Sequence, residues 1–134
     1  KPFDYMSLST IETDRPGNTY TADTLAQIYD SYKKIYFIIG ADSLLYIQDW
    51  YHPEYICSHC HLLCANRDNN SASVLIDQKH FLADKYGAVI DFIDVPELPY
   101  SSTDIRKKVA MGLSVKEDVG EEVEEYIKSR KLYV

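Results

Sequence analysis

The chain has 134 residues, of which 46% are hydrophobic and 26% are charged, enough for one globular domain with a real core. Its formal net charge of -7 argues against a general nucleic-acid-binding protein, because nonspecific affinity for DNA comes from Lys and Arg side chains that neutralise phosphates. No run approaches the roughly 18 to 20 apolar residues of a membrane-spanning helix, and no secretory signal opens the chain. We therefore expect a cytoplasmic protein with neither nucleic acid nor membrane as a partner.

The first elements expected along the chain are a strand, a turn and a helix. Polar and apolar side chains alternate over residues 7–12, which is typical of a short strand, and the turn sequence DRPGN follows at 14–18. From Thr21 an amphipathic helix is predicted, with Thr21 as its N-cap. One face of this helix would carry the side chains spaced at helical intervals, Leu25, Ile28, Tyr29 and Tyr32.

Three apolar runs predict the strands of a mostly parallel sheet. The run at 35–40 ends in Gly40 and is apolar almost throughout, which indicates a strand buried on both faces. Two further runs, at 61–66 and 88–95, alternate with helical segments, including a longer helix over about 73–86. This alternation predicts an α/β fold with helices flanking the sheet, in a single domain over residues 1–134.

The C-terminal part is predicted to hold two helices. The first begins near Thr103 and ends at Gly112, and the second covers 119–133. The apolar side chains expected to face inward from the second helix are Val119, Val123, Tyr126 and Ile127.

The segment PYSSTDIR at 99–106 places three hydroxyls and a guanidinium at the start of the first of these helices. One hydroxyl is enough to cap a helix, so Ser101, Ser102 and Thr103 together exceed that need. A helix N-terminus favours anions, and the planar fork of Arg106 suits phosphate oxygens. The segment therefore predicts a site for a polyphosphate, in one crevice with residues 40–43 at the end of the first predicted strand of the sheet.

A cluster of thiols and imidazoles in ICSHCHLLC offers an alternative chemistry. A C-x2-C pair beside two His side chains could bind zinc, but a closed zinc site usually takes two ligands from a second, distant segment. Without secretory features, reduced thiols that behave as small hydrophobic side chains are the preferred interpretation. The residues concerned are Cys57, His59, Cys60, His61 and Cys64.

Three segments in this order resemble a known family. They are NTYTADTL at 18–25, IIGADSL at 38–44 with Trp50 close behind, and SSTDIR at 101–106. Together they resemble the bacterial nicotinate-nucleotide adenylyltransferases, members of the HxGH-type nucleotidyltransferase superfamily. The resemblance implies a Rossmann-like nucleotidyltransferase fold that transfers AMP from ATP to nicotinate mononucleotide, giving nicotinate adenine dinucleotide and pyrophosphate in NAD biosynthesis. It also implies Mg²⁺ as the cofactor that accompanies ATP.

The same resemblance implies which residues contact ATP. Ser102, Thr103 and Arg106 would contact its phosphates, while Gly40 and Asp42 would belong to a nucleotide-contacting loop. Gly40 would let the backbone approach the ligand, and the Asp42 carboxylate would accept hydrogen bonds from ribose hydroxyls. The alternative for this loop is structural, with Gly40 ending a strand and Asp42 capping the next helix.

The mononucleotide would be held by an aromatic pair. By resemblance, Trp50 and Tyr51 would hold the pyridine ring and Thr21 would help to place the nicotinate group. The alternative is that these aromatic side chains only pack against the core. Arg67, after the second apolar run, lies where the family often has an Arg near the substrate, but the sequence that follows Arg67 departs from the family's pattern.

One segment of the family has no counterpart in this sequence. The N-terminal GxFxPxHxGH segment, whose His side chains stabilise charge on the reacting phosphates, is missing, so no catalytic residue is assigned. We therefore expect the C-terminal portion of such an enzyme, without its N-terminal β-α units and nearly inactive by itself. An open sheet edge would favour a homo-oligomer. The other functions left open are a non-catalytic nucleotide-binding or regulatory module and a small zinc-binding module.

Overall fold

The structure is a computed structural model that divides the chain into two compact units, Lys1–Pro96 and Glu97–Val134, each described by itself. The single domain expected over the whole chain therefore stays a prediction. None of the helices in the described part of the chain is long and apolar enough to cross a membrane. The described residues are 3–32, 34–66, 72–96 and 100–134.

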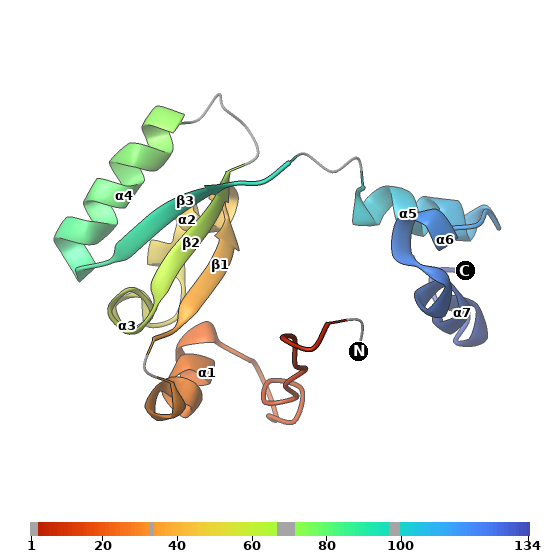
Figure 1. Cartoon of the computed structure of the whole chain (residues 1–134), viewed down its shortest axis with the longest axis horizontal. Helices are drawn as coiled ribbons and strands as arrows, with labels where there is room; N and C mark the ends of the chain where they lie inside the picture. The colour runs from red at the N-terminus through yellow and green to blue at the C-terminus, as the bar shows by residue number, and fades with distance from the viewer. Residues whose placement is uncertain (1–2, 33, 67–71, 97–99) are drawn as a thin grey trace. The chain divides into compact units, whose positions relative to one another are not determined.

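A three-stranded parallel sheet forms the centre of the first unit (Figure 1). The strands lie in the order β1-β2-β3, and their bounds are Tyr36–Gly40, His61–Asn66 and Val89–Asp94. In the register of the sheet, Ile39 pairs with Cys64 and Cys64 pairs with Phe92. The three apolar runs thus form the expected strands, and the α/β fold with a parallel sheet is confirmed.

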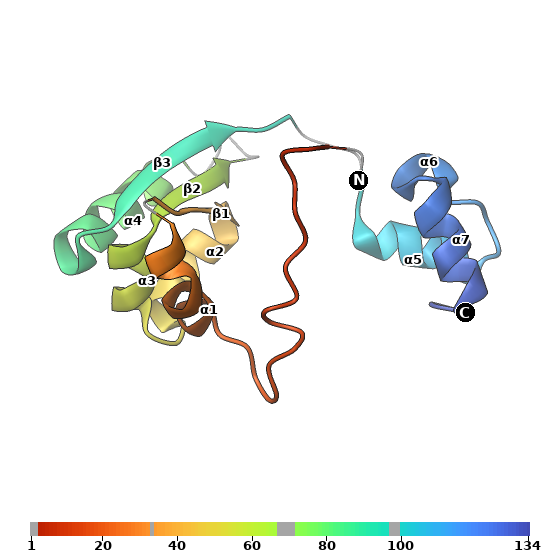
Figure 2. The same ribbon diagram turned by 60° about the horizontal axis from the view of Figure 1, so that its bottom comes forward.

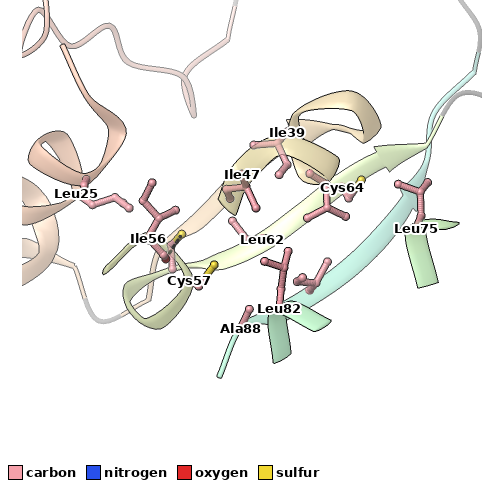
Figure 3. Packing of buried hydrophobic residues seen from close by; sticks show 14 residues of the cluster. Leu25, Ile39, Ile47, Ile56, Cys57, Leu62, Cys64, Leu75, Leu82 and Ala88 are labelled. Carbon is pink, nitrogen blue, oxygen red and sulfur yellow. Dashed lines mark hydrogen bonds between the residues drawn. The ribbon is translucent and has the colours of Figure 1, made fainter. Parts of the chain in front are cut away.

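Helices of the first unit pack on one face of this sheet, as Figure 2 shows for α2 and α3. Successive side chains of a strand point to opposite faces, so Leu62 and Cys64 of β2 both face the helices and are fully buried. Figure 3 shows how Leu75 and Leu82 of α4 close the same core. The helices are α1 (Thr21–Ile28), α2 (Ala41–Tyr46), α3 (Pro53–His59) and α4 (Ala72–Tyr86), with short 3-10 helices η1 (Tyr29–Ser31) and η2 (Ile47–Asp49).

Within the described residues of the first unit, side chains on the opposite face of β1 are exposed, which corrects the expectation that this strand is buried on both faces. Ile39 is only 6% exposed, whereas its neighbour Ile38 is 65% exposed. Tyr36 and Val89, which lie in one row across the sheet with His61, are also exposed. An apolar run by itself does not distinguish one covered face from two, because the covering depends on which helices pack against the strand.

The N-terminal segment contains no strand at residues 7–12, so that prediction is wrong. Its side chains bond locally instead: the Thr10 hydroxyl donates to Asp14 Oδ2 at 2.6 Å, and the Asp14 N–H donates to the Thr10 carbonyl. Such local bonds compete with strand pairing.

Helix α1 begins at Thr21, but Thr21 is its first helical residue and Tyr20 is the N-cap, without a side-chain bond. The prediction of Thr21 as N-cap is therefore wrong. The helix also ends earlier than its apolar pattern suggests, at Ile28, and continues as η1. Leu25 is buried while Tyr29 and Tyr32 remain exposed, so the predicted apolar face is only partly used.

The second unit holds α5 (Ser102–Ala110), α6 (Lys116–Val119) and α7 (Glu121–Ser129). Gly120 adopts a positive φ of 87°, which suits glycine, and it separates α6 from α7 within the stretch expected to form one helix. Of the four side chains predicted to face inward, Ile127 is buried, whereas Val123 and Tyr126 are exposed.

The second unit contains a buried carboxylate. Glu124 is only 7% exposed, and its Oε1 accepts from the Ser114 hydroxyl at 2.7 Å and from the Val115 N–H at 2.8 Å. Lys128 lies 2.8 Å from Oε2. Hydrogen bonds from Lys128, Ser114 and Val115 lower the pKa of Glu124 from 4.5 to about 2. The Glu124 carboxylate of α7 thus holds Ser114 and Val115, which precede α6, through hydrogen bonds.

Candidate functional site

A pocket of about 370 Å³ in the first unit brings together the three residues expected to bind the mononucleotide. Thr21 comes from the start of α1, and Trp50 and Tyr51 come from the segment that follows η2. These residues are almost thirty positions apart in the sequence, yet they line the same depression. Because the packing of α1 against α3 joins the two segments, the pocket is a product of the tertiary fold.

Aromatic contacts define the walls of this pocket. The Trp50 ring is partly buried and meets Phe37 of β1 edge to face, with ring centroids 6.3 Å apart. Tyr51 is more exposed, and its ring lies 4.5 Å from the ring of Tyr20. Such walls suit a flat heterocycle, because large aromatic surfaces are buried against it at a small cost in side-chain entropy. Trp50 therefore packs against the core and lines the pocket at the same time.

Gly40 and Asp42 lie where β1 meets α2, at the carboxyl end of the strand. Gly40 is the N-cap of α2, and a Cβ added there would meet no atom within 4 Å, so the backbone borders open space. The interpretation of Asp42 as a helix cap is wrong, because α2 has no side-chain cap bond. The Asp42 carboxylate is exposed in the first turn of the helix, which leaves it accessible to a ligand.

The hydroxyl groups at the start of α5 differ in their hydrogen bonds and exposure. Ser101 is the N-cap of α5: its Oγ accepts from the Asp104 N–H at 3.0 Å and donates to Asp104 Oδ2 at 2.8 Å. Ser102 and Thr103 are exposed, and Arg106 Nη2 donates to Thr103 Oγ1 at 3.4 Å. One hydroxyl thus caps the helix, while Thr103 and Arg106 share a face at its N-terminus. This arrangement can present donors to an anion.

Two expectations about the site lie beyond what the structure describes. The crevice expected to join residues 40–43 to Tyr100–Arg106 would lie between the two units, so it stays a prediction. Arg67 lies outside the described residues.

The thiol cluster is built into the core. Cys57, Cys60 and Cys64 are free and buried, and burial raises the pKa of Cys57 to about 11 and that of Cys60 to about 12. Metal binding requires the thiolate, which burial disfavours. Across the described ranges, no group of three or more His, Cys, Asp or Glu side chains is placed to hold a metal ion.

Several residues of the pocket were not anticipated from the sequence. Tyr20 and Thr19 precede Thr21 directly, so their position beside a predicted site residue was an available signal. Asp49 and Ile56 also line the pocket, and nothing in their local pattern marks them. A larger depression of about 610 Å³ lies between α1, α3 and the end of α4, where the ring of His59 stacks on Tyr55 at 3.8 Å.

Comparison with known proteins assigns the chain to a family. The profile of the cytidylyltransferase-like family matches residues 4–108, which span most of the chain. The chain belongs to this family. The match includes the segments of the pocket, the β1–α2 turn and the start of α5.

Curated relatives of the chain carry the expected name. Probable nicotinate-nucleotide adenylyltransferases of Thermoanaerobacter sp. (strain X514) and Moorella thermoacetica are each 38% identical over 132 residues, 96% of this chain. That of Lachnoclostridium phytofermentans is 35% identical over 97% of the chain. The resemblance to this group is therefore confirmed. The chain spans 63%, 61% and 66% of the lengths of these three relatives, respectively.

Solved structures support the fold. The Plasmodium falciparum nicotinic acid mononucleotide adenylyltransferase complexed with APC matches with a TM-score of 0.64 at 18% identity, over 88% of this chain and 60% of that one. The same enzyme complexed with NaAD matches with a TM-score of 0.63. The Rossmann-like nucleotidyltransferase fold is thus confirmed.

Proposed function

We propose that this chain forms the substrate-binding portion of a nicotinate-nucleotide adenylyltransferase. In this reaction a phosphate oxygen of nicotinate mononucleotide attacks the α-phosphorus of ATP, the bond to the β-phosphate oxygen breaks, and pyrophosphate leaves. The observation that supports the proposal most directly is the pocket shared by Thr21, Trp50 and Tyr51. The names of the curated relatives support the same activity.

The proposed role of the pocket is to hold the pyridine ring. The ring would lie against the aromatic faces of Trp50 and Tyr51, and the Thr21 hydroxyl would donate to the nicotinate carboxylate. Holding the mononucleotide in one orientation is itself catalytic, because a well-oriented attack avoids much of the entropy cost of bringing two substrates together.

The proposed ATP contacts come from two segments of the sequence. Ser102, Thr103 and Arg106 would donate to the phosphates, and the planar guanidinium of Arg106 offers a fork of donors that suits phosphate oxygens. Gly40 and Asp42 would border the nucleotide, with Asp42 accepting from ribose hydroxyls. These groups position the substrates and stabilise the negative charge that develops on the phosphates.

Mg²⁺ is proposed to come with ATP. Protein sites commonly bind Mg²⁺ through one or two carboxylates together with substrate phosphates. The described residues fit this pattern better than a dedicated metal site, because they offer exposed single carboxylates such as Asp42 and no ligand group of three. The ion would offset the charge of the triphosphate. The predicted cytoplasmic location and the homo-oligomer also stay predictions.

Steady-state kinetics of the full-length protein with ATP and nicotinate mononucleotide test the proposal through two variants. Trp50→Ala is expected to raise the KM for the mononucleotide roughly tenfold, the effect of losing about 1.4 kcal/mol of binding, with little change for ATP. Arg106→Ala should raise the KM for ATP instead, whereas Lys107→Ala, which removes an exposed charge on the same helix, should leave both values unchanged.

Other outcomes would favour the alternatives. A protein that binds ATP without releasing pyrophosphate would be a nucleotide-binding or regulatory module. Stoichiometric zinc in elemental analysis, with helicity lost on chelation, would favour the zinc module. Unchanged kinetics in both the Trp50 and Arg106 variants would show that the site is assigned wrongly.

A further inference from the structure

We propose that Thr24 is a positioning residue for the mononucleotide pocket. Its hydroxyl joins two charged side chains of the preceding turn, Glu12 and Arg15, to the first turn of α1 and thereby fixes the wall formed by Tyr20. This inference rests on the proposed function, since it concerns the same pocket.

The link consists of two hydrogen bonds to side chains that meet at Thr24 Oγ1, which also lies 3.4 Å from the Tyr20 carbonyl oxygen, a longer alternative acceptor. Thr24 Oγ1 donates to Glu12 Oε1 at 2.7 Å, and Arg15 Nη2 donates to Thr24 Oγ1 at 3.4 Å. The hydroxyl thus lies between a carboxylate and a guanidinium, where it can donate to the anion and accept from the cation. Hydrogen bonds to charged groups are stronger than those between neutral groups, and the short bond from Thr24 to the Glu12 carboxylate is the stronger part of this link.

Arg15 has few alternatives to this bond. Its Nε and Nη1 atoms are buried and have no hydrogen-bond partner within the described part of the chain. A buried donor without a partner is costly, so the position of the guanidinium depends on the acceptor that it does have. Removing the Thr24 hydroxyl would free the turn and leave Glu12 without its donor.

A continuous path of contacts leads from Thr24 to the pocket. The Thr24 N–H donates to the Tyr20 carbonyl at 3.2 Å, the first hydrogen bond of α1. The ring of Tyr20 in turn lies 4.5 Å from that of Tyr51. Tyr20, Thr21 and Tyr51 all line the pocket, so a shift in the first turn of α1 would move one wall relative to the other. Thr24 itself is not among the lining residues and would act only through them.

The test compares Thr24→Val with Thr24→Ser in the full-length protein. Valine has nearly the shape of threonine without the hydroxyl, whereas serine keeps the hydroxyl. Thr24→Val should raise the KM for nicotinate mononucleotide roughly tenfold, with kcat and the KM for ATP within about twofold of wild type. Thr24→Ser should restore the KM to within about twofold. Glu12→Gln, at an exposed position, should raise the same KM about threefold and serves as the second variant if Thr24→Val does not fold.

Four results would overturn the proposal. Thr24→Val or Glu12→Gln could leave the KM for the mononucleotide unchanged, whether or not the melting temperature falls. Either variant could impair both substrates or kcat equally, which would indicate a purely structural role. Thr24→Ser could be as impaired as Thr24→Val, which would exclude the hydroxyl. Finally, a wild-type protein that forms no dinucleotide would contradict the proposed function and therefore also this inference. The first three results would contradict only the inference and would leave the proposed function unaffected.

Discussion

Two adjacent isoleucines of β1 offer a matched test of the fold. Ile39 faces the helices and is 6% exposed, whereas Ile38 points to the open face and is 65% exposed. Truncating a buried Ile to Ala commonly costs about 2–5 kcal/mol, since a cavity remains. Ile38 has only about a third of its surface buried, so its three lost carbons, at about 0.8 kcal/mol each when fully buried, should cost less than about 1 kcal/mol. We therefore expect Ile39→Ala to be the more destabilising by about 2 kcal/mol.

Urea unfolding of the 134-residue chain measures this difference. Trp50 is the single tryptophan and packs against Phe37 of the same strand, so its fluorescence follows the unfolding of the first unit. With a slope of about 2 kcal/mol per molar urea, the midpoint of Ile39→Ala should fall about 1 M below that of Ile38→Ala. Equal midpoints would refute the reasoning, because they would mean that the outer face of β1 is covered in solution as well.

Two further predictions concern buried ionisable groups. Because the pKa of Glu124 is lowered from 4.5 to about 2, its ionised form stabilises the second unit above about pH 4.5, and that stability should be lost as the pH falls toward 2. Glu124→Gln should lower the melting temperature measured by circular dichroism at pH 7, and it should flatten the dependence of the melting temperature on pH between about 4.5 and 2. The exposed control Glu125→Gln should do neither. Identical pH profiles for the two variants would contradict the role of the Glu124 carboxylate. The raised pKa values of Cys57 and Cys60 predict that neither thiol reacts with Ellman's reagent at pH 8 until urea unfolds the protein, whereas rapid reaction of the native chain would contradict their burial.

The candidate site was only partly predictable from the sequence. The family resemblance selected Thr21, Trp50 and Tyr51, which line one pocket, and their binding of the mononucleotide stays a prediction. Tyr20 could be suspected from its place beside Thr21, but its ring contact with Tyr51 depends on the tertiary fold. At the start of α5 the sequence contains several hydroxyl groups that could cap the helix. Only the structure identifies Ser101 as the cap, because its Oγ accepts a hydrogen bond from the Asp104 N–H.

By itself, the sequence determined the α/β alternation and the parallel sheet, because short apolar runs between amphipathic segments have few other ways to satisfy their backbone bonds and bury their side chains. Only the tertiary structure decided which face of each element is used. Ile38 and Ile39 have the same side chain and opposite exposure, and Glu124 is buried in the helix where Val123 is exposed. Burial depends on what packs against a residue, and that partner is brought close by the fold as a whole.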